Sequence, residues 1–191
     1  LLAQSVNSSL LDYWDNAFKD PEHLVKYSVQ RAWWYAKQNN VSSVLDVGCG
    51  NGRLLYGMKC LLPDAALYGV DFSDTGISRM KKEYGIRGRT MDIFDLDTLP
   101  YIFDMVVVND VLEHVEDEKK FIQKCLNRLK DGGIFYLSLP NNYLGPKDTD
   151  EHLRLYTEES TRELLDGFPY PYLLELIDIH ILCIVKKGKT I

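Results

Sequence analysis

The sequence predicts an α/β fold built on a doubly wound, mostly parallel sheet. Two observations lead to this prediction. Apolar runs of strand length alternate with amphipathic helical patterns between residues 44 and 139, and such alternation is typical of a parallel sheet covered by helices. The first run, residues 44–47, leads directly into three closely spaced glycines and a helical pattern, as in nucleotide-binding α/β domains.

Each element follows from its own residue pattern. Asp20 and Pro21 suit the start of a helix, and apolar residues at helical spacing continue to Ala36, so a helix is expected to cover one side of the sheet. The helix after the glycines is expected from the apolar spacing of residues 54–62. Further strands are expected at 66–71, 86–91, 103–109 and 133–139, and helices at 75–84 and 117–130, with Gly132 as a stop signal.

The C-terminal end has a different pattern. Thr157 is expected to begin a short helix, with Glu158 and Glu159 in its first turn. Residues 172–187 carry an almost continuous strand signal that is interrupted around residue 178. We interpret this stretch as two strands that form a hairpin.

Composition narrows the class of protein. The 191 residues are 46% hydrophobic, which suits one globular domain with a sizeable core. The net charge of −6 and the lack of a dense Lys/Arg run argue against a nucleic-acid surface. No apolar run approaches the roughly 18 residues that span a bilayer. The four cysteines are scattered, without a zinc or disulfide pattern, so a reducing, cytoplasmic location is expected.

The glycine loop and a later acid predict a cofactor site. The loop reads G-x-G-x-G from Gly48 to Gly52, whereas the dinucleotide fingerprint is G-x-G-x-x-G. Asp71 ends the next strand, 71 − 52 = 19 residues beyond Gly52. An acid about 20 residues after the loop can accept hydrogen bonds from ribose hydroxyls. The simpler alternative is a solvated carboxylate at a strand end.

The stretch VLDVGCGNGRLL, together with the motifs that follow it in order, resembles the class I S-adenosylmethionine (SAM)-dependent methyltransferases over about residues 41–187. This resemblance implies SAM as cofactor and a Rossmann-like, seven-stranded sheet with a C-terminal antiparallel strand. Residues 1–40 are then expected to form an N-terminal helical cap on the same domain, and residues 41–191 the SAM-binding domain.

The resemblance also implies roles for single residues. Asp92 would face the adenine amino group, with Ile93 against the ring, and Asn109 and Val111 would offer backbone to the methionine end. Asp46 would hold the loop amides or, through water, the ammonium group. The predicted cofactor-binding residues are Asp46, Gly48, Cys49, Gly50, Gly52, Asp71, Phe72, Asp92, Ile93, Asn109 and Val111.

A group of two acidic residues and one histidine follows the fourth predicted strand. Asp110, Glu113 and His114 are spaced i, i+3, i+4, so they would share a face in a helix. The pattern is similar to the acid-x-x-Glu-His arrangement of ubiquinone-biosynthesis O-methyltransferases, where the equivalent residues bear on a divalent metal. We predict no metal and assign His114 as the catalytic base, with a metal ligand and a structural histidine as the alternatives.

Further candidates for the acceptor side lie at both ends of the chain. His152, Arg154 and Tyr156 alternate with leucines, so an extended segment would place them on one face. They are predicted to bind the acceptor, and the alternative is a loop tied down by polar contacts. Tyr13 and Trp14 are predicted to lie over the site, and the alternative for them is simple packing.

The predicted function is SAM-dependent methyl transfer to O, N or C of a small, polar, possibly anionic molecule. Arg154 suggests that the acceptor is an anion, because a guanidinium can bind a carboxylate bidentately. One alternative is a non-catalytic SAM-binding partner subunit. The other is an NAD-type oxidoreductase, which the glycine spacing disfavours.

Overall fold

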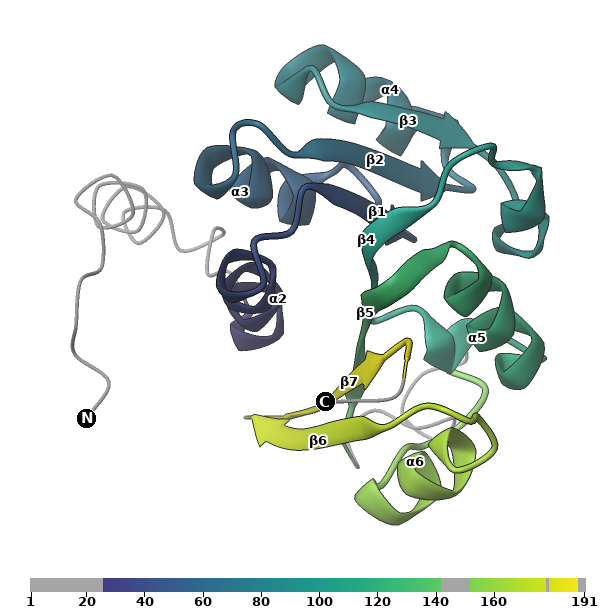
Figure 1. Cartoon of the computed structure of the whole chain (residues 1–191). Coiled ribbons are helices and arrows are strands. Elements are labelled where there is room, and N and C mark those ends of the chain that lie inside the picture. The colour runs from purple at the N-terminus through teal and green to yellow at the C-terminus, as the bar shows by residue number, and fades with distance from the viewer. Residues whose placement is uncertain (1–25, 142–151, 178, 189–191) are drawn as a thin grey trace.

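The computed structural model describes residues 26–141, 152–177 and 179–188. This part contains a seven-stranded sheet in the order β3-β2-β1-β4-β5-β7-β6 (Figure 1). Neighbouring strands from β3 to β5 run parallel, and β7 runs antiparallel to both β5 and β6. The predicted fold class is confirmed. The strands are β1 (Ser43–Val47), β2 (Ala66–Asp71), β3 (Arg87–Thr90), β4 (Phe103–Asn109), β5 (Leu129–Pro140), β6 (Tyr172–Ile177) and β7 (His180–Lys186).

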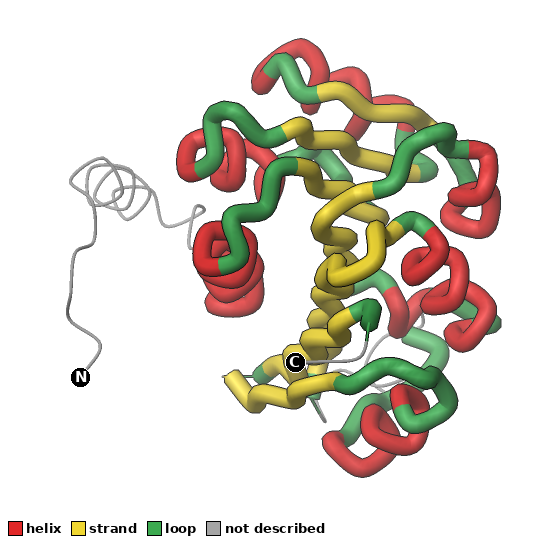
Figure 2. The backbone as a smooth tube through the Cα atoms, viewed as in Figure 1, coloured by secondary structure: helices red, strands yellow, loops and turns green. Residues whose placement is uncertain are grey.

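Helices cover both faces of the sheet (Figure 2). Side chains of α2, α3 and α4 form one hydrophobic core with one face of the strands. Side chains of α5 and α6 form a second core with the opposite face. The helices are α2 (Tyr27–Gln38), α3 (Arg53–Leu61), α4 (Asp74–Tyr84), α5 (Glu118–Asn127) and α6 (Glu158–Leu165), and the 3₁₀ turns are η2 (Ile93–Thr98) and η3 (Leu112–His114).

Local sequence explains where these elements begin. The Ser73 hydroxyl accepts a hydrogen bond from the Gly76 amide and caps α4. Thr157 caps α6 in a reciprocal box with Ser160, which confirms the predicted start. The predicted C-terminal hairpin is also confirmed, with Ile177 paired to His180 across its tight turn.

The predicted end of one helix differs clearly from the structure. The helix predicted over 117–130 ends at Asn127, because Leu129 pairs with Phe103 and already belongs to β5. Gly132, with φ +78°, therefore lies in an irregular stretch of β5 and does not end the helix. Helix α2 begins at Tyr27, after Lys26, and the predicted start at Asp20 and Pro21 lies outside the described residues.

The strand order places the candidate site. The chain leaves β1 toward β2 on one side, whereas β4 lies on the other side of β1. Ligands of open α/β sheets bind at such a switch point, outside the carboxyl ends of the strands. Residues 48–52, 71–73 and 109–114 follow those ends. Within the described part of the chain, no helix is long and apolar enough to cross a membrane.

Candidate functional site

The loop after β1 is fixed by its own backbone hydrogen bonds. The amides of Gly48 and Cys49 donate to the Val70 carbonyl at 2.8 and 3.1 Å, and the Gly52 amide donates to the Cys49 carbonyl at 2.9 Å. The Cys49 side chain is buried and its thiol lies 4.0 Å from the Met80 sulfur. The loop therefore holds its shape without help from a ligand.

Two glycines of the loop show why side chains are excluded there. Gly48 has φ +77°, and a Cβ at this position would lie 2.4 Å from Cγ2 of Val111. Gly50 has φ +52°, and a Cβ there would meet no atom within 4 Å. Gly48 is thus required for close packing. The bare backbone of Gly50 borders open space that a ligand can enter.

Asp71 connects the loop to the start of α4. One oxygen of its buried carboxylate accepts the Gly50 amide at 2.7 Å, and the other accepts the Ser73 amide at 2.8 Å. A carboxylate has about four acceptor positions, so room remains for the ribose hydroxyls predicted to bind it. Phe72, beside it, is 84% exposed, which leaves its ring available to an adenine.

Asp46 lies buried directly before the loop. Burial and, to a smaller extent, the charge of Asp71 together raise the pKa of its carboxyl group to about 7. The first of its two predicted roles, holding the loop amides, is taken by other groups. The amides of Gly48 and Cys49 donate to the Val70 carbonyl, and the Gly50 amide donates to Asp71. Contact with a cationic ligand group would favour the charged carboxylate and remains the prediction.

The other predicted cofactor residues lie at the same edge of the sheet. Asp92 is exposed after β3 and accepts the Phe94 amide at 2.8 Å, which caps η2. Ile93 packs against the core beneath. Asn109 ends β4, and Val111 follows it against Gly48. The carboxyl ends of β1 to β4 thus bring the whole predicted set to one edge.

The group of Asp110, Glu113 and His114 after β4 is arranged differently from the prediction. Asp110 has φ +54°, outside the helical region, so it does not share a helix face with Glu113 and His114. Its carboxylate lies 2.6 Å from Nζ of Lys26 and 3.3 Å from Nε2 of His180. The predicted i, i+3, i+4 grouping is therefore wrong, because the helical turn begins only after residue 111.

His152 takes the place that was expected for Asp110. The rings of His114 and His152 meet edge to face with centroids 4.8 Å apart. Ligand atoms of these two residues and Glu113 all lie within 4.8 Å of one another. The Leu153 amide donates to the Glu113 carbonyl at 2.8 Å and so ties the segment around residue 152 to η3.

This Glu113–His114–His152 cluster has the chemistry of a divalent-cation site. Burial raises the pKa of the Glu113 carboxyl group, and the charge of Asp110 adds to the effect. Its Oε2 is buried and has no hydrogen-bond partner. A buried acceptor without a partner is costly, and a cation between the carboxylate and two imidazoles would satisfy it. These three residues fit a metal ion, and Asp110 does not belong to the set.

Arg154 and Tyr156 are held by the protein itself. His152, Arg154 and Tyr156 point inward, as the alternation predicted, whereas Leu153 and Leu155 are exposed. The Arg154 guanidinium donates to the carbonyls of residues 112, 115 and 116 and pairs with Glu118 at 3.1 Å. The Tyr156 hydroxyl donates to Glu118 at 3.0 Å. Both side chains fix the segment that carries His114. This is the alternative to acceptor binding given above, a loop tied down by polar contacts.

Sequence reasoning missed Lys26 and His180. His180 directly precedes the apolar residues 181–185. This position was a usable signal, because an imidazole in a buried strand needs a polar partner. Lys26 carried no such signal. Tyr13 and Trp14 lie outside the described residues, so their position over the site stays a prediction.

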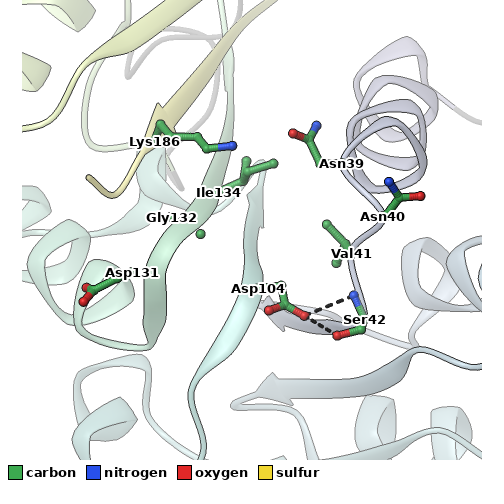
Figure 3. Close-up of a pocket in the computed structure, with 10 residues that line it drawn as sticks. Asn39, Asn40, Val41, Ser42, Asp104, Asp131, Gly132, Ile134 and Lys186 are labelled. Carbon is green, nitrogen blue, oxygen red and sulfur yellow. Dashed lines mark hydrogen bonds between the residues drawn. The ribbon is translucent and has the colours of Figure 1, made fainter. Parts of the chain in front are cut away.

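A separate cavity lies at the opposite edge of the sheet (Figure 3). Its volume is about 210 Å³. Asp104, at the start of β4, forms part of its wall and accepts hydrogen bonds from the amide and hydroxyl of Ser42. The other lining residues come from 39–41, 131–134 and Lys186. This cavity borders the amino ends of the parallel strands and does not belong to the site described above.

Comparison with solved structures agrees with this fold. The plantazolicin methyltransferase BpumL in complex with SAH superposes with a TM-score of 0.73 at 15% identity, covering 96% of this chain and 92% of that one. A SAM-dependent methyltransferase from Archaeoglobus fulgidus gives 0.72 at 18% identity, over 93% and 99% of the two chains.

Sequence comparison identifies the family. The ubiquinone biosynthesis O-methyltransferase of Idiomarina loihiensis is 29% identical, over 78% of this chain and 79% of that protein. The Coxiella burnetii protein of the same name is 31% identical, and this chain spans 58% of its length. A family described as methyltransferase domain matches residues 38–171. Because that match covers more than half of the chain, the protein belongs to this family and is a class I SAM-dependent methyltransferase domain.

Proposed function

We propose that this domain transfers the methyl group of SAM to an oxygen, nitrogen or carbon atom of a small polar molecule. The supporting observation is that the glycine loop with Asp71 and the Glu113–His114–His152 cluster follow the carboxyl ends of adjacent strands. Relatives named as O-methyltransferases favour oxygen as the acceptor atom. The cluster also favours an enzyme over a non-catalytic SAM-binding subunit.

The reaction needs alignment and removal of a proton. The sulfonium methyl is already activated, so holding donor and acceptor in line supplies much of the rate. His114 is exposed next to buried Glu113, and we assign it as the base that takes the acceptor's proton. A neighbouring carboxylate would stabilise the imidazolium that forms.

A divalent cation is the alternative way to activate the acceptor. Glu113, His114 and His152 would hold it, and it would lower the pKa of a bound hydroxyl group. In that case His114 would be a ligand, and the proton would pass to another group. Activity with and without chelator separates the two assignments.

We propose a polar acceptor without requiring a negative charge. The predicted anion rested on Arg154, whose guanidinium is committed to the segment 112–118.

Packing of α2 on the sheet supports one domain that includes residues from the predicted cap. All four cysteines are free thiols, which is consistent with the proposed cytoplasmic location.

The test is methyl transfer from labelled SAM to a panel of small hydroxyl, amine and carbon-acid acceptors, with and without EDTA. We expect turnover of a hydroxyl compound, and a loss with His114→Ala that leaves SAM affinity within about threefold. If the whole panel stays unlabelled while a macromolecular acceptor is methylated, the proposed substrate class is wrong.

A further inference from the structure

The Asp110 carboxylate joins three elements at the edge of the site. It contacts Lys26 before α2, His180 at the start of β7, and the side-chain amide of Asn109 at the end of β4, the last at 3.2 Å. Burial alone would raise the pKa of Asp110, but the contacts with His180 and Lys26 outweigh it and lower the pKa. The group is therefore a carboxylate anion, with one oxygen bonded to Lys26 and the other 3.3 Å from Nε2 of His180.

The contact with His180 is the sheltered one. The side chain of Lys26 is 57% exposed, and that of His180 only 4%. Water and salt screen an exposed ion pair, so the lysine adds little. The buried imidazole is the partner that can fix the carboxylate in one place.

Asp110 occupies a strained corner with a consequence for the cofactor loop. Its φ of +54° is unusual for a residue with a side chain, and such a conformation persists only where the surroundings hold it. The turn places Val111 against Gly48, so close that a Cβ atom on Gly48 would lie 2.4 Å from the valine side chain. Because Gly48 belongs to the glycine loop, the corner forms one wall of that loop.

We propose that His180 is a positioning residue for the SAM site, and that it acts through Asp110 to hold the corner of residues 109–111 against the glycine loop. This rests on the proposed function, since it takes the glycine loop as the cofactor site. Nδ1 of His180 is buried without a hydrogen-bond partner. A buried polar atom without a partner makes the free energy of folding less favourable. Such a loss of stability is expected where a residue serves a functional site.

The first experiment measures SAM and S-adenosylhomocysteine affinity of the full chain by calorimetry. His180→Leu should weaken binding at least about tenfold, since it removes the buried 3.3 Å contact between Nε2 and the Asp110 carboxylate. His180→Gln should stay within about threefold, because its amide can donate from nearly the same place as Nε2. Tyr35→Phe is the matched control. It loses the 2.6 Å bond from the tyrosine hydroxyl to Glu175, away from the corner, and should bind like the wild type.

The second experiment asks whether the effect passes through Asp110. Glycine adopts positive φ readily, so Asp110→Gly keeps the turn and removes the contact. Alone it should weaken SAM binding about tenfold, and adding His180→Leu should change affinity by less than about twofold. Wild-type affinity in Asp110→Gly, or a full further loss in the double variant, overturns the proposal. A wild-type chain that binds no SAM would instead overturn the assignment of the site, so the two failures are distinguishable.

Discussion

Asp71 and Gly50, 21 residues apart in the chain, are joined by a 2.7 Å hydrogen bond from the glycine amide to the buried carboxylate. The acid predicted to bind the ribose thus also fixes the loop that borders the cofactor. Its second oxygen accepts the Ser73 amide and fixes the start of α4. Because one side chain both shapes the loop and is predicted to bind the cofactor, altering it should change cofactor affinity and stability together.

Replacing Asp71 by alanine should therefore have two effects. Loss of the ribose contact should weaken SAM binding at least about tenfold. Loss of the acceptor for two partly buried amides should also lower the free energy of unfolding, by about 2 kcal/mol. Calorimetric titration and urea unfolding measure the two quantities. Asp71→Asn, which keeps one acceptor oxygen, should lie between alanine and the wild type. Unchanged affinity in the alanine variant would remove Asp71 from the site.

Asp46 should make stability depend on pH. Its folded pKa of about 7 lies above the ordinary value of 3.8, so between about pH 4 and pH 7 the folded chain keeps a proton that the unfolded chain has lost. The stability linked to this group is full below pH 4 and falls as the pH rises to 7, by up to about 4 kcal/mol. Unfolding midpoints of the wild type and Asp46→Asn should converge in acid and separate toward neutral pH, with the asparagine variant the more stable. Parallel curves would contradict the raised pKa.

The same carboxyl group offers a test of the predicted ammonium contact. A cationic group next to Asp46 favours its charged form, so SAM binding near pH 6 to 7 should release a proton. The binding enthalpy should then vary with the ionisation enthalpy of the buffer. Asp46→Asn should abolish that variation. Buffer-independent enthalpies in the wild type would place the ammonium group elsewhere.

The sequence predicted the sheet and the glycine loop well, because strand apolarity and loop glycines are local signals. The Glu113–His114–His152 cluster was only half predicted. The hydrogen bond from the Leu153 amide to the Glu113 carbonyl brings His152 to η3 and spans 40 residues, and no local pattern encodes that contact. Asp110 was misplaced because the spacing suggests a helix, whereas the helical turn begins only at Leu112. Arg154 had the chemistry of an anion binder, and only the structure shows that carbonyl groups use its donors.

Arg154 should prove structural. Arg154→Lys keeps the charge but cannot reach the several acceptors that the guanidinium fork serves, so unfolding stability should drop by about 1–3 kcal/mol, with SAM affinity retained. Arg162→Met is the control, because that arginine forms an exposed i, i+4 pair with Glu158 and its loss should leave the melting temperature unchanged. A stable Arg154→Lys variant with a raised KM for the acceptor would restore the predicted binding role.

On the alternative assignment, in which a metal activates the acceptor, the Glu113–His114–His152 cluster binds a divalent cation that prefers imidazole and carboxylate ligands, such as Zn²⁺ or Co²⁺. Three ligand atoms already lie within 4.8 Å of one another, so binding needs little rearrangement. Added metal should raise the melting temperature by mass action, and Co²⁺ should give a visible absorption band from its coordination. Glu113→Gln should remove both signals, since the amide is a far weaker ligand than the carboxylate. Glu116→Gln is the matched control, because Glu116 is an exposed carboxylate close in sequence that lies outside the cluster. Equal metal responses in Glu113→Gln and Glu116→Gln would show that the cation binds elsewhere, and would leave His114 as the base without a metal.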